Sequence, residues 1–442
     1  MGNSERDTIF ALSSAAGPAG IAVVRISGPR AALALRILAG EVPQPRQARL
    51  LDLGKKELID RGLVLWFPAP DSFSGEDVAE LQVHGGRAVV AALLVALAEI
   101  PGLRPAGPGE FSRRAFENGK FDLTQAEAIA DLVAAETEAQ RRQAQVQLGG
   151  ALGRRYEGWR GCLMKALAHF ESAIDFVDEE IEVDLEEERR ELGRVAKEIA
   201  LHLAERRGER LRDGLSLAIV GPPNAGKSSL LNWLARRDAA IVSATAGTTR
   251  DVIEVHLDLG GWPVVVADTA GLRRASGDGI EEEGLRRARE RAEAADLRLV
   301  VVDAGHWPNV DAETASLLDE RSVVLINKVD LTEVSVRQTP GGAPAYAVSV
   351  KTGEGLSEVL AVLEDRLAGE LAPEGASLTR ARHRFALEES QEELGRALIA
   401  GAEVELAAEN LRLASRALGR ITGRVDVEDI LDLVFAEFCI GK

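Results

Sequence analysis

The chain of 442 residues has little cysteine and no long apolar run, and each shortage excludes a class of protein. Its two cysteines, Cys162 and Cys439, cannot build a disulfide framework, so a reducing compartment is predicted. The best apolar run, Ala88 to Ala98, ends at Glu99, well short of the roughly 20 residues that cross a bilayer. The N-terminus carries early charge and lacks the apolar stretch of a signal peptide. The sequence therefore predicts a cytoplasmic protein with no membrane segment.

Basic residues are outnumbered by acidic ones, because 53 Lys and Arg stand against 71 Asp and Glu, for a formal net charge of −18. A chain this acidic is not one that coats nucleic acid indiscriminately. The acidity is uneven, however: residues 1–120 hold 14 Lys and Arg against 13 Asp and Glu, for a net of +1. A nucleic-acid partner would therefore have to meet a selected basic face rather than the whole molecule.

The distribution of apolar residues predicts several domains. Up to about residue 118, short apolar runs alternate with glycine and proline; residues 21–26 and 63–67 are predicted strands, and residues 87–100 a helix ended by Pro101. This part is a predicted α+β domain. Alanine- and glutamate-rich sequence with helical spacing then runs to about residue 212, and helical composition returns after about residue 378.

Between the two helical stretches, β-branched runs alternate with loops and helical segments, which predicts a mainly parallel, doubly wound sheet. These strands are predicted at residues 215–220, 264–267, 299–302 and 323–326. The predicted division is 1–118 (α+β), 119–212 (helical, first part), 213–374 (α/β nucleotide domain) and 375–442 (helical, second part). The simplest layout inserts the nucleotide domain into one all-α domain. Separate helical domains on either side are the alternative.

The first chemical motif is a phosphate-binding loop. Residues 221–228, GPPNAGKS, match G-x-x-x-x-G-K-[ST] directly after a predicted strand and before a helix. The glycines let backbone N–H groups close on phosphates, and the helix N-terminus adds positive potential. Lys227 would reach the β- and γ-phosphates, while Ser228 would coordinate Mg²⁺.

Three further segments follow in the order that a guanine-nucleotide site requires. Residues 268–271, Asp268-Thr269-Ala270-Gly271, place Asp268 near magnesium and the Gly271 amide near the γ-phosphate. In Asn327-Lys328-Val329-Asp330, the Asp330 carboxylate can accept two hydrogen bonds from guanine, which adenine cannot donate. Residues Ser349, Val350 and Lys351 would support the base through backbone N–H groups. The sequence therefore predicts a GTPase.

The hydrolytic machinery is less evident. Leu272 follows Gly271 at the place where Ras-like switches have a water-orienting glutamine, and leucine cannot bind water. Candidate replacements are Glu281, Glu282 and Glu283, although most such runs are the first turn of a helix, where they suit its dipole. Asn224 and residues 243–249 offer oxygen ligands for a monovalent cation among the phosphates. A mobile switch loop is the alternative interpretation of that segment.

Four motifs together resemble those of one known family. They are P-N-A-G-K-S-S at 223–229, A-G-T-T-R-D at 246–251, D-T-A-G-L-R at 268–273 and the terminal C-I-G-K at 439–442. The chain resembles the tRNA-modifying GTPases called MnmE or TrmE. The likeness extends over the whole length, including residues 72–77 and 108–111. The C-x-G-K ending is highly specific, whereas the phosphate loop alone is shared by many families.

This resemblance implies a function on tRNA. A (carboxymethyl)aminomethyl group would be added at C5 of the wobble uridine, with 5-formyl- or methylene-tetrahydrofolate as the one-carbon donor. The implied partner is an FAD-dependent protein called MnmG or GidA, in a hetero-oligomer. The N-terminal domain would bind the folate and form a homodimer, and the G domains would pair across K⁺ during hydrolysis. The alternative is a regulatory GTPase switch in RNA or ribosome assembly, without folate chemistry.

The resemblance also assigns residues. It gives Mg²⁺ to Ser228 and Thr249, and the water-orienting role to Glu281, with Glu282 as a rival because the loop from Gly271 is one residue longer than usual. It implies that Cys439 is necessary for the modification. The implied K⁺ ligands are Asn224, Ser243, Thr245 and Thr248, and the implied folate residues are Arg25, Glu80, Lys120 and Lys442. The remaining predicted nucleotide contacts are Ala225, Gly226, Ser229, Ala244, Ala246 and Gly247.

Overall fold

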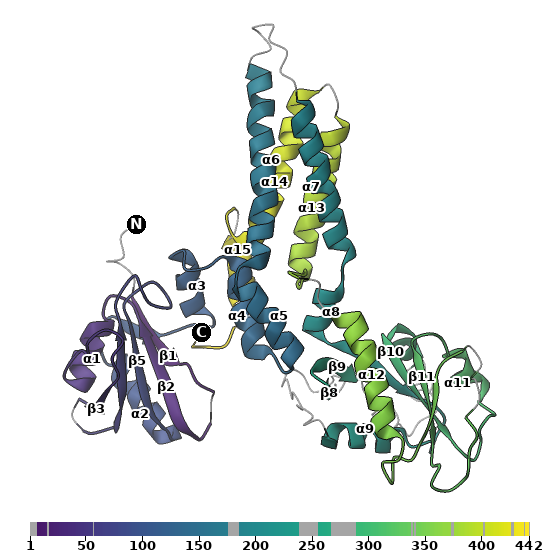
Figure 1. Ribbon diagram of the computed structural model, residues 1–442. Helices are drawn as coiled ribbons and strands as arrows, with labels where there is room; N and C mark the ends of the chain where they lie inside the picture. The colour runs from purple at the N-terminus through teal and green to yellow at the C-terminus, as the bar shows by residue number, and fades with distance from the viewer. Residues whose placement is uncertain are drawn as a thin grey trace, which may run out of the picture. The chain divides into compact units, whose positions relative to one another are not determined.

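The computed structural model describes residues 7–15, 17–55, 57–175, 185–237, 255–266, 289–336, 339, 342–372, 375–400, 403–425, 428–436 and 438–441. The chain divides into two compact units. The first comprises residues 1–130, 147–197 and 386–442, and the second comprises residues 131–146 and 198–385. Figure 1 labels the helices and strands of both units. No helix among these described residues is both long and apolar enough to span a bilayer.

The N-terminal part of the first unit is a six-stranded sheet in the order β3-β4-β5-β2-β1-β6. All neighbours are antiparallel except β1 and β6. The strands are β1 (Thr8–Leu12), β2 (Ala19–Ser27), β3 (Arg49–Leu53), β4 (Asp60–Phe67), β5 (Val78–Gly85) and β6 (Leu103–Pro105). Helices α1 (Ala31–Ala39) and α2 (Arg87–Ala98) bury Leu35, Leu38, Leu93 and Leu97 in one core with the sheet. The α+β prediction is confirmed.

The opposite face of this sheet is covered only in part among the described residues. Helix α3 (Glu110–Glu117) contributes Phe111 to a small core with Ile9 and Ala11 of β1, and Phe73 packs against it. The outer strands leave apolar side chains exposed on that face, among them Leu50 and its cross-strand partner Leu63.

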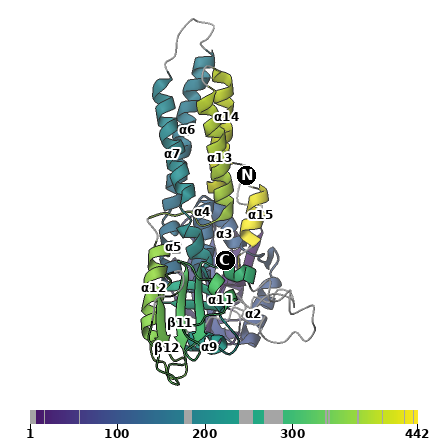
Figure 2. The ribbon, with the colours of Figure 1, turned by 90° about the vertical axis from the view of Figure 1, so that its right-hand side faces the viewer.

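The rest of the first unit is helical. The unit contains α6 (Ala151–Asp175), α14 (Val404–Thr422) and α15 (Glu428–Ala436), together with parts of α4 (Leu123–Ala134), α5 (Glu138–Leu148), α7 (Glu186–Ala204) and α13 (Ala381–Ile399). Helix α6 packs along α14, which lies far away in sequence (Figure 2). Residues before and after the nucleotide domain thus form one helical assembly, which confirms that the nucleotide domain is inserted.

The second unit contains the predicted doubly wound sheet, with strand order β12-β11-β10-β7-β9-β8. All neighbours are parallel except β8 and β9. The strands are β7 (Leu215–Val220), β8 (Val255–Leu259), β9 (Trp262–Val266), β10 (Leu297–Asp303), β11 (Ser322–Asn327) and β12 (Ala345–Val348). Strands β10 and β11 are buried on both faces, which explains the apolar runs at residues 299–302 and 323–326 in the sequence.

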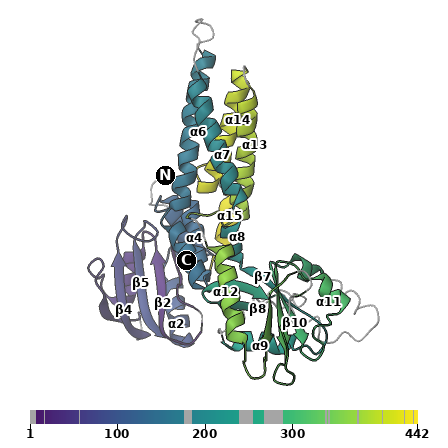
Figure 3. The same cartoon turned by 45° about the vertical axis from the view of Figure 1, so that its right-hand side comes forward.

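Helices cover one face of this sheet, and among them is α9 (Lys227–Arg237), which follows the phosphate loop. Helices α8 (Arg207–Asp213), α9 and α12 (Leu356–Leu371) share a core with β7, and α12 packs against β8 and β9 (Figure 3). The opposite face buries Val300, Val302 and Ile326. The short α11 (Ala312–Ser316) lies between β10 and β11 along the chain.

The start of α5 belongs to the second unit although it precedes the nucleotide domain in sequence. Its Ala139 N–H donates to the Gly261 carbonyl at 3.0 Å, in the turn between β8 and β9. The adjacent Glu136 carboxylate pairs with His256 of β8 at 3.1 Å. The β8–β9 hairpin is therefore fastened to α5 by contacts from outside the predicted 213–374 range.

Candidate functional site

The phosphate loop joins β7 to α9, and two of its glycines are sterically required. Gly221 has φ +135°, and a Cβ atom there would lie 2.1 Å from the Val301 carbonyl oxygen. Gly226 has φ +107°, and a Cβ atom there would lie 2.2 Å from the Asn327 side-chain nitrogen. Only glycine allows both the positive φ and the close approach of the loop to its neighbours.

Lys227 stands at the first turn of α9 with its side chain inside this loop. Its Nζ donates to the carbonyl oxygens of Gly221 at 2.7 Å and Pro222 at 2.8 Å. Burial lowers the pKa of Lys227. The ammonium is thus held at the point where the loop backbone turns, which is the position from which it can meet phosphate oxygens.

The segments predicted to read the base are tied to the phosphate loop through Asn327. Its Nδ2 donates to the Ala225 carbonyl at 2.7 Å, and its Oδ1 accepts from the Val350 N–H at 3.1 Å. The Ser349 hydroxyl donates to Asp330 Oδ1 at 2.8 Å, which orients the carboxylate. The ends of β7, β11 and β12 are thereby fixed relative to one another, as a ligand that touches all three requires.

A pocket of about 850 Å³ connects these segments. Pockets of roughly this size accommodate drug-sized and nucleotide-sized ligands. The lining residues are Pro223, Asn224, Gly226, Lys227, Ser228, Ser229, Asn232, Trp233, Arg236, Asn327, Lys328, Asp330, Leu331, Val350 and Lys351. Asn232, Trp233 and Arg236 are not predicted from the sequence; their signal is the i, i+3, i+4, i+7 spacing from Ser229 along α9.

Several predicted site residues lie outside the described part of the chain. They are Ser243, Ala244, Thr245, Ala246, Gly247, Thr248, Thr249, Asp268, Thr269, Ala270, Gly271, Glu281, Glu282 and Lys442. Their roles stay predictions.

Three of the predicted folate residues lie in the first unit, and two of them, Arg25 and Glu80, are in contact. Arg25 and Glu80 face each other in the β2–β5 register, and their side chains form an ion pair at 2.9 Å. The Arg25 guanidinium lies 4.9 Å from the centre of the Phe73 ring. Lys120 Nζ donates to the Pro70 carbonyl at 2.9 Å, so it lies against the other end of the loop that carries Phe73.

The loop at residues 70–77 is anchored by a buried polar network. Glu76 is 2% exposed and accepts hydrogen bonds from Ser27 Oγ at 2.7 Å and from Arg114 Nη1 at 3.2 Å. Asn118 Nδ2 donates to the Ser74 carbonyl at 2.7 Å. These contacts hold the loop, and with it Phe73, beside Arg25.

The C-terminal tail reaches the same N-terminal part. Ile440 pairs with Pro108 in an antiparallel bridge, and the Ser13 hydroxyl donates to the Gly441 carbonyl at 2.9 Å. Cys439 is exposed, and it lines an apolar pocket of about 590 Å³ with residues of β1 and α2. The thiol therefore lies on the N-terminal part rather than on the helices that precede it in sequence.

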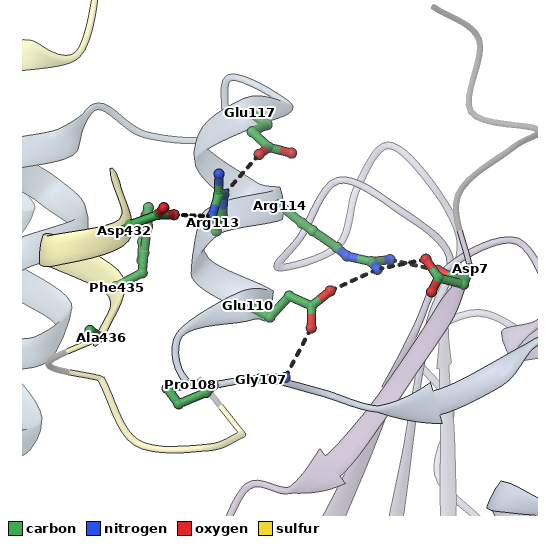
Figure 4. Close-up of a pocket in the computed structure, with 10 residues that line it drawn as sticks. All are labelled: Asp7, Gly107, Pro108, Glu110, Arg113, Arg114, Glu117, Asp432, Phe435 and Ala436. Atoms are coloured by element: carbon green, nitrogen blue, oxygen red, sulfur yellow. Dashed lines mark hydrogen bonds and ion pairs between the residues drawn. The ribbon is translucent and has the colours of Figure 1, made fainter. Parts of the chain in front are cut away.

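A polar pocket of about 620 Å³ lies where α3 meets α15 (Figure 4). Arg113 of α3 pairs with Asp432 of α15 at 2.7 Å, while Arg114 points the other way, toward Asp7 and Glu110. Glu110 also accepts from the Gly107 N–H at 2.9 Å. Charged side chains thus connect the last helix to the N-terminal part.

Glu110→Gln tests this charge network. Burial alone would raise the pKa of Glu110, but hydrogen bonds from Arg104 and the Gly107 N–H, with the charge of Arg114, hold it at about 2, below the usual 4.5. A lowered pKa stabilises the fold at pH above 4.5, and this contribution is lost as the pH falls toward 2. We expect the variant to lose about 1–2 kcal/mol of unfolding free energy at pH 7, after allowance for solvent screening.

Denaturant titrations of Glu110→Gln and wild type between pH 7 and pH 3 measure this difference. The matched control is Glu117→Gln, on the same helix in a more exposed pair with Arg113, where we expect about 0.5 kcal/mol or less. A Glu110 variant that behaves like the control at pH 7, or whose deficit persists unchanged at pH 3, would contradict the prediction.

Comparisons with known proteins show which family the chain resembles. A family model described as the MnmE helical domain matches residues 123–439, and one described as the GTP-binding protein TrmE N-terminus matches residues 8–120. The tRNA modification GTPase MnmE of Paramagnetospirillum magneticum is 58% identical over 445 residues, covering 99% of this chain and 100% of that protein. The 5-taurinomethyluridine-[tRNA] synthase subunit GTPB3, mitochondrial, of Danio rerio is 48% identical over 469 residues, covering 99% and 93%.

The fold and the nucleotide pocket make this chain a P-loop GTPase, an enzyme that hydrolyses GTP. It belongs to the MnmE family of tRNA modification GTPases. The family resemblance drawn from the sequence motifs is confirmed.

Proposed function

We propose that this chain is the GTP-hydrolysing component of a complex that adds a (carboxymethyl)aminomethyl group to C5 of tRNA wobble uridine. The observation that carries the proposal is the coexistence, in one chain, of a guanine-nucleotide pocket, the Arg25–Glu80 ion pair and a Cys439-bearing tail that bonds to the N-terminal part at Pro108 and Ser13. The name of the zebrafish relative supports it, because that protein is a subunit of an enzyme that makes a 5-substituted uridine in tRNA. The family resemblance supplies the FAD-dependent partner, MnmG, and the role of Cys439 in the modification.

The proposed one-carbon donor is a tetrahydrofolate, 5-formyl or methylene, bound at Arg25, Glu80, Lys120 and Lys442. A pterin ring presents adjacent N–H and amino donors, and the Glu80 carboxylate can accept both. The ion pair with Arg25 keeps that carboxylate oriented, and the same guanidinium lies 4.9 Å from the centre of the Phe73 ring. Lys120 and Lys442 supply cations for the glutamate tail of the folate.

Glu80→Gln tests the folate proposal. The amide keeps the shape of the side chain but replaces an acceptor with a donor, so we expect affinity for 5-formyltetrahydrofolate to fall by roughly 10- to 100-fold. Calorimetric titration of the full chain measures this, with thermal unfolding as the check on folding. The control is Asp52→Asn, an exposed carboxylate of the same sheet, which should bind like wild type. Wild type that binds no reduced folate would overturn the proposal.

The proposed hydrolytic machinery combines K⁺ with an acidic side chain. Asn224 lines the nucleotide pocket with a left-handed backbone, φ 62°, and would share K⁺ with Ser243, Thr245 and Thr248. Ser228 and Thr249 would coordinate Mg²⁺. Since Leu272 cannot orient water, Glu281 is proposed to do so. The cation would stabilise the charge that develops on the phosphates.

GTP turnover of wild type and Glu281→Ala, measured in K⁺ and in Na⁺ at equal ionic strength, tests the roles of the cation and of Glu281. We expect roughly tenfold or faster turnover in K⁺, and Glu281→Ala is expected to lower turnover by about 100-fold while GTP affinity changes little. Equal turnover rates in both salts would exclude the proposed role of K⁺. A larger loss from Glu282→Ala than from Glu281→Ala would move the water-orienting role to Glu282.

A homodimer through the N-terminal part is also proposed, with the G domains pairing during hydrolysis. Its support is the sheet face away from α1 and α2, where Ile21, Leu50 and Leu63 are 62%, 54% and 39% exposed. An apolar sheet face of this kind is typical of an interface. Sedimentation of the full chain at micromolar concentration measures its mass, and a monomer would exclude the dimer.

A further inference from the structure

We infer that Asp303 is a positioning residue for guanine binding, because it fixes the side chain of Lys328 at the base-binding end of the nucleotide pocket. Asp303 does not line that pocket itself, whereas Lys328 does. It would therefore act on the nucleotide only through Lys328.

Asp303 is the last residue of β10, and it stands opposite Asn327 in the β10–β11 register. Its Oδ2 accepts a hydrogen bond from Lys328 Nζ at 2.6 Å, and its Oδ1 accepts from the Gly305 N–H at 2.9 Å. Both carboxylate oxygens are thus engaged, one by the loop that follows β10 and one by the lysine. The hydrogen bond from the lysine lowers the pKa of Asp303, so this carboxylate is ionised at neutral pH.

The backbone around Lys328 shows that its conformation is enforced. Lys328 has φ +70°, a left-handed value that costs free energy in a residue with a side chain. The loops after β10 and β11 are tied together by two further bonds, from the Ala304 N–H to the Asn327 carbonyl at 2.8 Å and from Trp307 Nε1 to the Ser335 carbonyl at 3.3 Å. Such strain persists only where the surroundings over-determine it, and it is typical of functional sites.

The ion pair acts on the long, flexible part of the lysine. Lys328 lies between Asn327, which fixes the phosphate loop, and Asp330, which reads the edge of the base. A bound guanine that meets Asp330 with its edge would present a flat face to the methylene stem of Lys328. Because Asp303 holds the far end of that stem, the side chain is ordered before the nucleotide arrives, and binding does not have to restrict it.

Preorganisation of this kind affects GTP and GDP alike, because it concerns the base and not the γ-phosphate. Without Asp303, we expect both nucleotides to bind about three- to tenfold more weakly, with faster dissociation. Turnover at saturating GTP should not change. The direction of the change in affinity distinguishes this effect from simple electrostatics. Removal of a negative charge near an anionic ligand would by itself tighten nucleotide binding rather than weaken it.

The experiment uses the full chain with Asp303→Ala, Lys328→Met and the double variant. Dissociation of a fluorescent GDP is followed by stopped flow, and GTP and GDP affinities are obtained by competition. If the inference is right, Asp303→Ala weakens both nucleotides by the same factor and the double variant binds no more weakly than Lys328→Met alone. Glu320→Gln, an exposed acid at the opposite end of β11, is the control and should bind like wild type.

Three results would overturn the inference: unchanged or tighter binding in Asp303→Ala, additive losses in the double variant, or a loss confined to GTP. Asp303→Asn covers the case in which the alanine variant folds poorly, because its amide oxygen can still accept from the Gly305 N–H. It should show the same direction of change, with thermal unfolding of the nucleotide-free protein close to that of wild type.

Discussion

Asp330→Asn is expected to weaken GTP binding by roughly 100-fold or more and to create affinity for XTP. A carboxylate accepts from both guanine donors, whereas an amide leaves one of them facing another donor. Xanthine has an oxygen in place of the 2-amino group, so it matches the amide. Ser349 holds the side chain in place at 2.8 Å, which keeps the geometry and changes only the pattern of donors and acceptors.

Competition between GTP, XTP and ATP for the purified chain measures this change of preference. Asp365→Asn, an exposed aspartate on α12, removes the same charge from the same unit and should keep the preference for GTP. A variant at Asp330 that still prefers GTP to XTP would show that guanine is read elsewhere.

Lys227→Ala is expected to lower kcat/KM for GTP by roughly 1,000-fold, or about 4 kcal/mol of transition-state stabilisation. The ammonium sits inside the phosphate loop on the Gly221 and Pro222 carbonyls, from which it can reach the charge that builds up on the phosphates. Lys197→Ala, an exposed lysine of α7, is the matched control. Turnover within tenfold of wild type in the Lys227 variant would contradict the assignment.

The central sheet of the nucleotide unit could be predicted because the apolar pattern within each strand is enough to identify it. Strands β10 and β11 are buried on both faces, so their middle parts appear in the sequence as the apolar runs 299–302 and 323–326. The polar motifs that follow them must then lie at one edge of the sheet, where parallel strands end together. That reasoning places Asn327 and Asp330 near the phosphate loop without any knowledge of register.

Other features depend on register or on distant contacts, and no local pattern reports them. The Lys328–Asp303 pair exists because β10 and β11 align Asp303 with Asn327. The edge strand β8 is short and only half apolar, so it gives no clear signal. The contact between Ser13 and Gly441 joins residues 428 positions apart, and only the folded chain brings them together.

The most direct test of the account is mass analysis of wobble uridines in tRNA from cells that lack this chain, complemented with wild type, Lys227→Ala or Cys439→Ser. We predict loss of the 5-substituted uridine in the deletion, recovery with wild type, and no recovery with either variant, although Cys439→Ser should still hydrolyse GTP. Wobble uridines that remain fully modified in the deletion would contradict the account.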